Sequence, residues 1–138
     1  MSKHRFWKLV LISYICAMKD GCLPETDRRI LYKTNEFSSF YNKMPLSVQL
    51  KMEYVFNIVQ TVHILPSNFV KLLTGSRFYE LRVATRANAY RIIAFAIDHE
   101  SIIEASRIIL LNAFLKKSSK DYTKQIEKAE KILNDFMI

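Results

Sequence analysis

The chain has 138 residues and a formal charge of +8, from 21 Lys and Arg against 13 Asp and Glu. This length favours one domain, and a composition that is 50% hydrophobic and 25% charged excludes an intrinsically disordered chain. The basic excess suits an anionic partner, namely nucleic acid, a membrane surface or an acidic protein, although a basic surface without a partner has the same composition.

Residues 1–28 differ from the rest of the chain. A basic stretch, Met1 to Arg5, precedes an apolar run from Phe6 to Met18 that Lys8 interrupts. This order resembles a secretory signal, but no small-residue cleavage site follows, and the run is shorter than the roughly 20 residues that a membrane-spanning helix needs. An accessory helix, a membrane-surface segment and an upstream extension all stay open. We favour an accessory helix or an extension over a signal, and we expect no stable membrane association.

The two cysteines, Cys16 and Cys22, also lie in this segment. Their spacing fits no zinc motif. Two cysteines make a weak disulfide framework, so we expect reduced thiols in a cytoplasmic protein.

The main domain is expected to span residues 29–138 and to begin with a short strand from Arg29 to Lys33. Asn35 can cap a helix that continues through Tyr41. Pro45 either ends this helix or opens the next, which is predicted from Leu46 to Ile64. Apolar residues at every fourth position predict one buried stripe on this second helix: Leu50, Tyr54, Ile58 and Val62, with Val55 and Val59 beside them.

The pattern then changes to the alternation that is typical of strands. Phe78 to Val83 places Tyr79, Leu81 and Val83 on one face and Phe78, Glu80 and Arg82 on the other. A turn at residues 87–89 leads into a second strand from Tyr90 to Ile97. Polar residues 98–100 predict a tight hairpin connection to a third run from Ser101 to Phe114. A helix can explain Glu104 to Leu111, but the β-branched residues of the run favour a strand that is covered on both faces.

Asp121 can cap a final helix. Its apolar stripe comprises Tyr122, Ile126, Ala129 and Leu133, and Phe136 or Met137 extends it. The predicted order is therefore an α+β layout, in which helices come first, an antiparallel meander follows and a helix ends the chain.

Common catalytic signatures are absent from the sequence, which contains no Gly-rich phosphate loop, no HExxH motif and no nucleophile elbow. The three histidines, His4, His63 and His99, are too far apart in sequence to argue for a catalytic pair. What remains is a set of cations in and around the predicted strands: Lys71, Arg77, Arg82, Arg91, Lys116, Lys117 and Lys120.

If the meander forms, these cations can converge on one side of the sheet. Arg can hold a phosphate through two parallel hydrogen bonds, and Lys adds a compact charge. Such a site can stabilise the pentacoordinate phosphate of RNA cleavage, with the RNA's own 2′-hydroxyl as nucleophile, while Tyr79 and Tyr90 stack on bases. A structural interpretation stays open, in which Arg82 pairs with Glu80 and the two tyrosines belong to the core.

Three segments resemble a known family when they are taken together. They are KLLTGSRFYELRVAT (Lys71 to Thr85), AYRIIAF (Ala89 to Phe95) and IILLNAFLKKSSKDYTKQIEKA (Ile108 to Ala129). Their order and gaps are similar to those of the HigB-like (phage-derived Gp49-like) branch of the RelE/ParE toxin superfamily, with its K-x-L-x-G-x-x-x-Y-E-L-R, Y-R-I/V and F-x-K-K-x-x-K patterns. The resemblance covers residues 29–138. It departs where Asp121-Tyr122 replaces the usual Thr-Pro, and residues 1–28 have no counterpart.

The resemblance implies a RelE-like fold, in which a small twisted antiparallel sheet is packed with two N-terminal helices and a C-terminal helix. It implies the cytoplasmic toxin of a type II toxin–antitoxin system, a metal-independent endoribonuclease without a cofactor that cuts mRNA on the ribosome and inhibits translation. The implied partners are mRNA, rRNA and an antitoxin, which is often a helix-turn-helix protein in this branch. Operator DNA is then contacted only through the antitoxin.

Carried over by position, the resemblance assigns catalysis to Arg82, Lys116 and Lys117. It also matches Lys71 and Arg91 to family positions, although Arg91 can be structural instead. We assign substrate binding to these two residues and, from their charge, stacking capacity and placement, to Arg77, Tyr90 and Lys120. Two alternatives stay open. One is a ParE-like toxin that poisons DNA gyrase, and the other is a catalytically degenerate member that acts only in an antitoxin complex on operator DNA.

Overall fold

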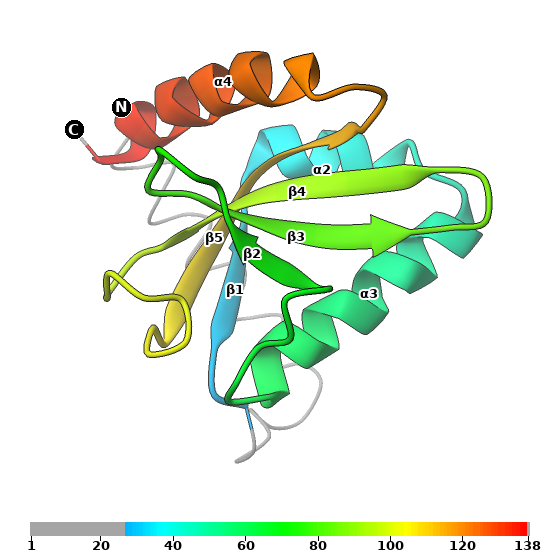
Figure 1. Cartoon of the computed structure of the whole chain (residues 1–138). Coiled ribbons are helices and arrows are strands. Elements are labelled where there is room, and N and C mark those ends of the chain that lie inside the picture. The colour runs from blue at the N-terminus through cyan, green and yellow to red at the C-terminus, as the bar shows by residue number, and fades with distance from the viewer. Residues whose placement is uncertain (1–26, 138) are drawn as a thin grey trace.

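A computed structural model describes residues 27–137 of the chain. The elements in chain order are β1 (Ile30–Lys33), α2 (Asn35–Asn42), α3 (Leu46–Thr61), β2 (Val70–Leu72), β3 (Tyr79–Ala84), β4 (Ala89–Ala96), β5 (Arg107–Leu115) and α4 (Lys120–Met137) (Figure 1). The thiols of Cys16 and Cys22, and the predicted accessory helix up to residue 26, lie outside the described residues. Within this part of the chain, no helix combines the length and the apolar character needed to cross a bilayer.

The five strands form one sheet in the order β1-β5-β4-β3-β2. The predicted antiparallel meander is confirmed, since each strand from β2 to β5 pairs antiparallel with the next. β1, however, pairs with β5 in parallel, so the prediction of a wholly antiparallel sheet is wrong at this edge. The reason is that α2 and α3 carry the chain from β1 across the sheet to the far edge, which is the kind of crossover that parallel pairing requires.

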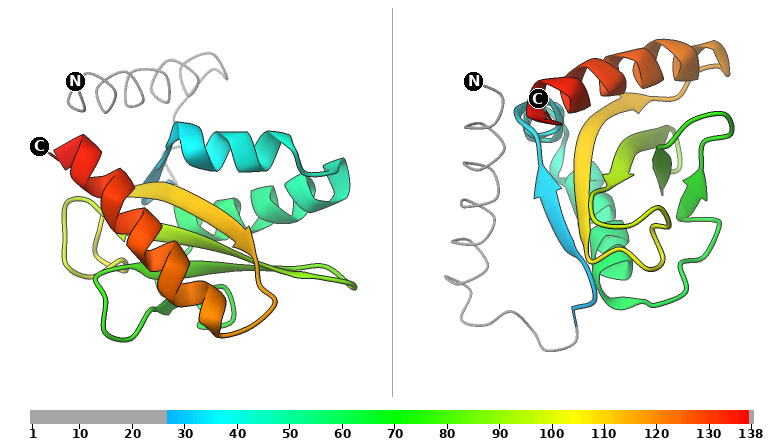
Figure 2. Two further views of the ribbon diagram at one scale, coloured as in Figure 1. Left: turned by 90° about the horizontal axis from the view of Figure 1, so that it is seen from above. Right: turned by 90° about the vertical axis from the view of Figure 1, so that its left-hand side faces the viewer.

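The helices cover both faces of the sheet, α2 and α3 on one face and α4 on the other (Figure 2). The core on the α2–α3 side includes Phe37, Met52, Phe56, Leu81 and Ile108. The core on the α4 side includes Phe78, Ile93, Ile109, Ala129 and Leu133. The α+β class and the apolar stripe of the last helix are therefore as predicted, and the alternation of β3 sends Leu81 and Phe78 to opposite sides.

Helix α3 buries Val55 and Val59 as predicted, but not the neighbouring stripe that contains Leu50, Tyr54 and Val62. Its buried residues are Val48, Met52, Val55, Phe56 and Val59. Leu50 and Tyr54 are each 60% exposed. A helix with 3.6 residues per turn can carry two neighbouring apolar stripes, and the sheet takes up only the one that contains Met52 and Phe56. The helix also ends at Thr61 rather than Ile64.

Two helix starts differ from the prediction. Thr34, not Asn35, caps α2, because the Thr34 Oγ1 accepts a hydrogen bond from the Phe37 N–H. Asp121 lies inside the first turn of α4 rather than before it. Its carboxylate accepts hydrogen bonds from the backbone N–H groups of Lys117 and Ser118, so it ties down the loop before the helix. Pro45 opens α3, which resolves the two options for that residue.

The connection between β4 and β5 is a long loop, not a tight turn. β5 begins at Arg107 instead of Ser101. Asp98 closes the loop by accepting hydrogen bonds from the backbone N–H groups of Ser106 and Arg107. Ile102 is buried in the core from within this loop, which explains why its sequence resembles the start of a strand.

Arg29 fixes this loop to the rest of the fold. Its side chain donates hydrogen bonds to five backbone carbonyl groups, at 2.6 to 2.9 Å: those of Val59, Val62, His63, Ile102 and Ile103. Arg29 is only 1% exposed. Burial lowers its pKa, and the five carbonyl dipoles replace the water that the guanidinium loses. The end of α3 and the β4–β5 loop are joined through this one side chain.

Candidate functional site

The β3–β4 hairpin brings together the two arginines that the sequence singled out. Arg82 and Arg91 are directly opposed across the two strands. Glu80 lies two residues before Arg82 on the same face and is only 2% exposed. Its Oε1 accepts a hydrogen bond from the Arg82 Nε at 2.9 Å, and its Oε2 lies 3.6 Å from the Arg91 Nε. The pairing of Arg82 with Glu80 that the structural interpretation foresaw is therefore present.

A tyrosine from the last helix completes this group. The Arg91 Nε donates a hydrogen bond to the Tyr122 hydroxyl oxygen at 3.0 Å. The Tyr122 ring packs edge-on against Phe114, and the Lys116 Nζ lies 5.6 Å from the centre of the Tyr122 ring. We call Glu80, Arg82, Arg91 and Tyr122 the arginine cluster.

The two arginines differ in what they can offer a ligand. The Arg82 side chain is 31% exposed and that of Arg91 is 11% exposed. Arg91 also donates from Nη1 to the Tyr90 carbonyl oxygen, so it is held on both sides. The Arg82 Nη1 and Nη2 have no hydrogen-bond partner within residues 27–137. Two parallel N–H groups of this kind fit two oxygens of a phosphate. Glu80 holds the guanidinium in place through its hydrogen bond with the Arg82 Nε.

The Tyr122 hydroxyl interacts with both Arg91 and Glu80. Burial, followed by the Glu80 carboxylate, raises the pKa of Tyr122, and the neighbouring Arg91 opposes this rise. The phenol therefore stays neutral at physiological pH. Its oxygen accepts a hydrogen bond from Arg91, and the Glu80 carboxylate is the neighbouring acceptor for the phenolic proton. The sequence analysis placed Tyr122 in the apolar stripe and missed its polar end.

The predicted lysines lie around the cluster to different extents. Lys71 is exposed on β2 and is directly opposite Glu80. Lys116 is half-buried beside Tyr122. Lys117 and Lys120 are exposed at the start of α4. Among the described residues, none of these lysine side chains takes part in the hydrogen bonds and ion pairs of the cluster.

Two other predicted substrate-binding residues do not join the cluster. Arg77 instead holds α4, since its Nη2 lies 2.6 Å from the Glu130 Oε2 and its guanidinium lies over the ring of Phe95. Tyr90 is buried in the core, 7% exposed, with its ring edge-on to Phe40. Neither side chain lies in the arginine cluster, and their assignment to substrate binding stays a prediction.

Tyr79 has a structural contact as well, because its hydroxyl accepts a hydrogen bond from the Ile102 N–H in the β4–β5 loop. Among the described residues, no group of three or more His, Cys, Asp or Glu side chains could hold a metal ion.

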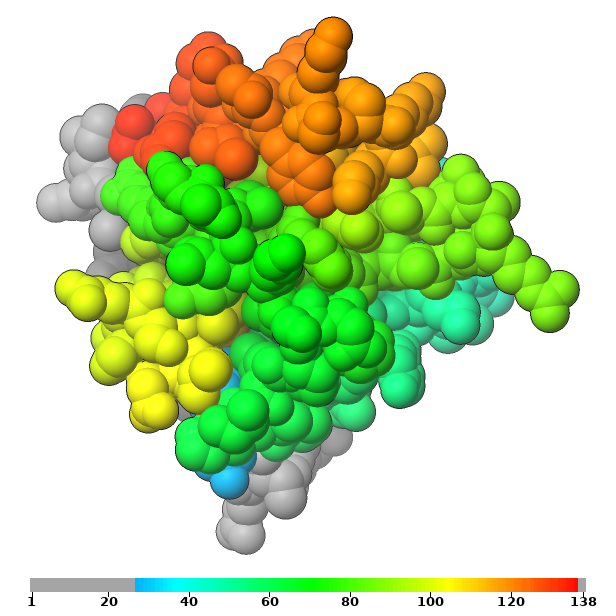
Figure 3. Space-filling view, viewed as in Figure 1, coloured from blue at the N-terminus to red at the C-terminus, as the bar shows by residue number. Residues whose placement is uncertain are grey.

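A hollow of about 360 Å³ lies beside the cluster, at the edge of β3. Lys51, Arg82 and Arg91 contribute to its lining, and no carboxylate does. The remaining lining residues are Tyr54, Val55, Asn68, Phe69, Val83, Ala84 and Ala89. The β3–β4 hairpin, which carries the two arginines of the cluster, projects between α4 and α3 at the surface (Figure 3).

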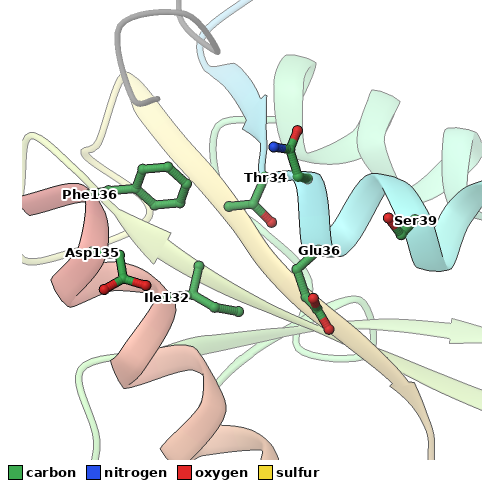
Figure 4. A pocket seen from close by; sticks show the side chains of 7 residues that line it. Thr34, Glu36, Ser39, Ile132, Asp135 and Phe136 are labelled. Carbon is green, nitrogen blue, oxygen red and sulfur yellow. The ribbon is translucent and has the colours of Figure 1, made fainter. Parts of the chain in front are cut away.

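Two further hollows have a different chemistry. One, of about 320 Å³, lies between the start of α2 and the end of α4, with Glu36 and Asp135 and no cation in its lining (Figure 4). The other, of about 530 Å³, is lined by Asp98 and Glu100, and its one cation, Arg77, is already paired with Glu130. Carboxylates repel an anionic chain, so of these three hollows in the described part of the chain, the hollow at β3 suits a nucleic acid best.

Comparison with known families identifies the chain. The model of the phage-derived Gp49-like family (DUF891) matches residues 39–134, which is more than half of the sequence. The chain belongs to this family. The Gp49-like family is RelE-like and is associated with the toxins of toxin–antitoxin systems, which implies an antitoxin partner. No curated protein and no solved structure matches the chain. The Gp49-like region includes the whole arginine cluster, whereas β1 lies outside it.

Proposed function

We propose that this Gp49-like protein is a HigB-like toxin of a type II toxin–antitoxin system and that it cuts mRNA on the ribosome. The observation that carries the proposal is Arg82: a buried carboxylate holds its Nε, and its Nη1 and Nη2 have no hydrogen-bond partner within residues 27–137. The association of the family with toxin nucleases supports it. In this proposal residues 29–138 form a RelE-like toxin domain that acts in the cytoplasm. An antitoxin binds it and mediates any contact with operator DNA.

The reaction that suits the cluster is transesterification of RNA. The 2′-oxygen attacks the adjacent phosphorus, the bond from phosphorus to the 5′-oxygen breaks, and a 2′,3′-cyclic phosphate and a 5′-hydroxyl form. Arg82 holds two phosphate oxygens and stabilises the charge that they gain, and Lys116 adds to the positive field.

Proton transfer also finds a group in the cluster. The leaving 5′-oxygen needs a proton, and the phenol of Tyr122, which is protonated at physiological pH, donates it and then regains a proton from solvent. The proton of the 2′-hydroxyl passes to solvent. Arg91 positions the phenol through its hydrogen bond to the Tyr122 oxygen.

The lysines act further along the RNA. Lys71, Lys117 and Lys120 are exposed and bind backbone phosphates of mRNA or rRNA in this proposal. Such contacts weaken with salt, by a slope of roughly −0.7 per phosphate on a single strand.

Induction of the protein in cells, with mapping of mRNA cut sites, tests the proposal. We expect the parent protein to arrest translation and to cut mRNA on ribosomes. Arg82→Ala removes the phosphate donor and is expected to slow cleavage by about 10²- to 10³-fold. Tyr122→Phe keeps the ring but removes the acid, for a loss of about 10²- to 10⁴-fold. The double variant Lys116→Ala/Lys117→Ala is also expected to be less toxic.

Arg107→Ala is a matched control, because Arg107 is an exposed arginine at the other end of the sheet. It is expected to cut as fast as the parent. Full toxicity of Arg82→Ala would contradict the site. Absence of ribosome-dependent cleavage by the parent would contradict the nuclease, and a DNA damage response in place of translation arrest would favour the gyrase-poisoning alternative.

A further inference from the structure

We propose that the hollow at the edge of β3 binds a nucleobase of the RNA, with Tyr54 as the stacking surface, next to the phosphate that Arg82 holds. The inference rests on the proposed nuclease function and adds to it a base-binding subsite on α3.

The subsite exists because β2 is short. β2 pairs with β3 only from Tyr79 to Leu81, and one further hydrogen bond joins the Arg82 N–H to the Phe69 carbonyl oxygen at 2.7 Å. Beyond Arg82, β3 has no neighbouring strand on this side within the described residues. The hollow lies at this free edge. It reaches from Val55 of α3 and Val83, which packs on the α3 side of the sheet, to Arg82 and Arg91, which lie on the α4 side.

Tyr54 is presented to this hollow as a stacking surface. Its side chain is 60% exposed although it is a large aromatic residue on a packed helix. Phe69 supports it edge-on, with ring centres 6.0 Å apart and planes at 68°. A ring held in this way loses little conformational freedom when a base stacks on it. Tyr79 and Tyr90, the predicted stacking residues, are engaged in the fold, so Tyr54 takes the role that was expected of them.

The charges around Tyr54 favour a nucleotide. Lys51 lies one turn before Tyr54 on the helix surface, and Arg82 and Arg91 lie across the hollow. Aromatic rings beside cations bind single-stranded nucleic acid, because the bases stack while the phosphates are neutralised. The Asn68 amide adds a donor and an acceptor for the polar edge of a base. A free strand edge also suits an extended peptide, but the three cations of the lining gain no electrostatic stabilisation from a neutral peptide.

Single-turnover cleavage on programmed ribosomes tests the subsite. The mRNA is used intact and with one abasic nucleotide, placed in turn on each side of the cut phosphate. On intact mRNA, Tyr54→Ala is expected to raise the half-saturating protein concentration by about 5- to 150-fold, which corresponds to the loss of one stacked base. Tyr54→Phe, which keeps the ring, is expected to recover most of this loss. Leu50→Ala is the matched control, since Leu50 is equally exposed on α3 but does not line the hollow.

The abasic mRNA shows whether the ring contacts a base. With the abasic nucleotide at one of the two positions, the half-saturating concentration of the parent is expected to rise as much as that of Tyr54→Ala rises on intact mRNA. On the same abasic mRNA, the half-saturating concentration of Tyr54→Ala is expected to rise no further. Two results overturn the subsite and leave the Arg82 proposal unaffected. The first is equal cleavage of intact mRNA by the parent and Tyr54→Ala, and the second is a Tyr54→Ala effect on the half-saturating concentration that is the same on intact and abasic mRNA. Normal cleavage by Tyr54→Ala with escape from the antitoxin overturns it in favour of a protein partner. No cleavage by the parent on any mRNA overturns the proposed function itself.

Discussion

Glu80 is the residue on which the arginine cluster depends for stability. In Glu80→Ala, Arg91 loses the only carboxylate near it among the described residues, and it stays opposite Arg82, where like charges repel. The Arg91 side chain is 11% exposed, so water can compensate little. Removing one partner of a buried ion pair costs about 3–5 kcal/mol. Arg82 is 31% exposed, and water replaces most of what it loses. We therefore expect Glu80→Ala to lower the free energy of unfolding by about 3–5 kcal/mol.

Urea unfolding of four proteins measures this effect: the parent, Glu80→Ala, Arg91→Leu and the double variant. Because the second change removes the unpaired charge, the double variant is expected to be about 1–3 kcal/mol more stable than the sum of the single changes predicts. Glu130→Ala is the control. Glu130 pairs with Arg77 at the surface, with side chains 39% and 50% exposed, and its removal is expected to cost at most about 1 kcal/mol. A loss below about 1 kcal/mol for Glu80→Ala, or strict additivity in the double variant, would refute the reasoning.

Two further predictions concern the fold. Arg29→Met leaves five carbonyl groups without a donor and is expected to cost about 3–5 kcal/mol in urea unfolding, whereas Arg28→Met, at an exposed neighbour, is expected to stay within about 0.5 kcal/mol of the parent. Burial, followed by the hydrogen bond to Glu53, raises the pKa of Tyr41 to about 12. Its contribution to stability is therefore fully present below the usual tyrosine pKa of about 10 and is lost as the pH rises toward 12. Tyr41→Phe is expected to lose less stability than the parent over this range, and equal losses would contradict the assignment.

Local patterns were sufficient to predict the part of the fold that carries the site. Alternation from Phe78 to Val83 is a property of consecutive residues, and it correctly separated Leu81 from Glu80 and Arg82. The proximity of Glu80 and Arg82 follows from the same period of two. The opposition of Arg82 and Arg91 then follows from the hairpin that joins the two strands.

The remaining features depend on contacts between distant parts of the chain. Tyr122 reaches Arg91 across 31 positions, and Arg29 reaches Ile102 across 73. Nothing in the local sequence distinguishes Arg29 from its exposed neighbour Arg28. Packing against the sheet also determines which of the two apolar stripes of α3 is buried. The local sequence does not contain this information, so Tyr54 was predicted to be buried and is instead exposed.

The three-residue length of β2 connects the fold to the proposed activity. If β2 continued for two more residues toward Asn68, it would pair with the end of β3 and close the hollow. An uncovered strand edge normally invites pairing with another sheet, and proteins block such edges with charged side chains. Here Arg82 and the exposed Arg86 lie at or beside the free edge. The same cations that discourage a second strand therefore make this edge suitable for RNA, whose backbone carries the opposite charge and needs no strand hydrogen bonds.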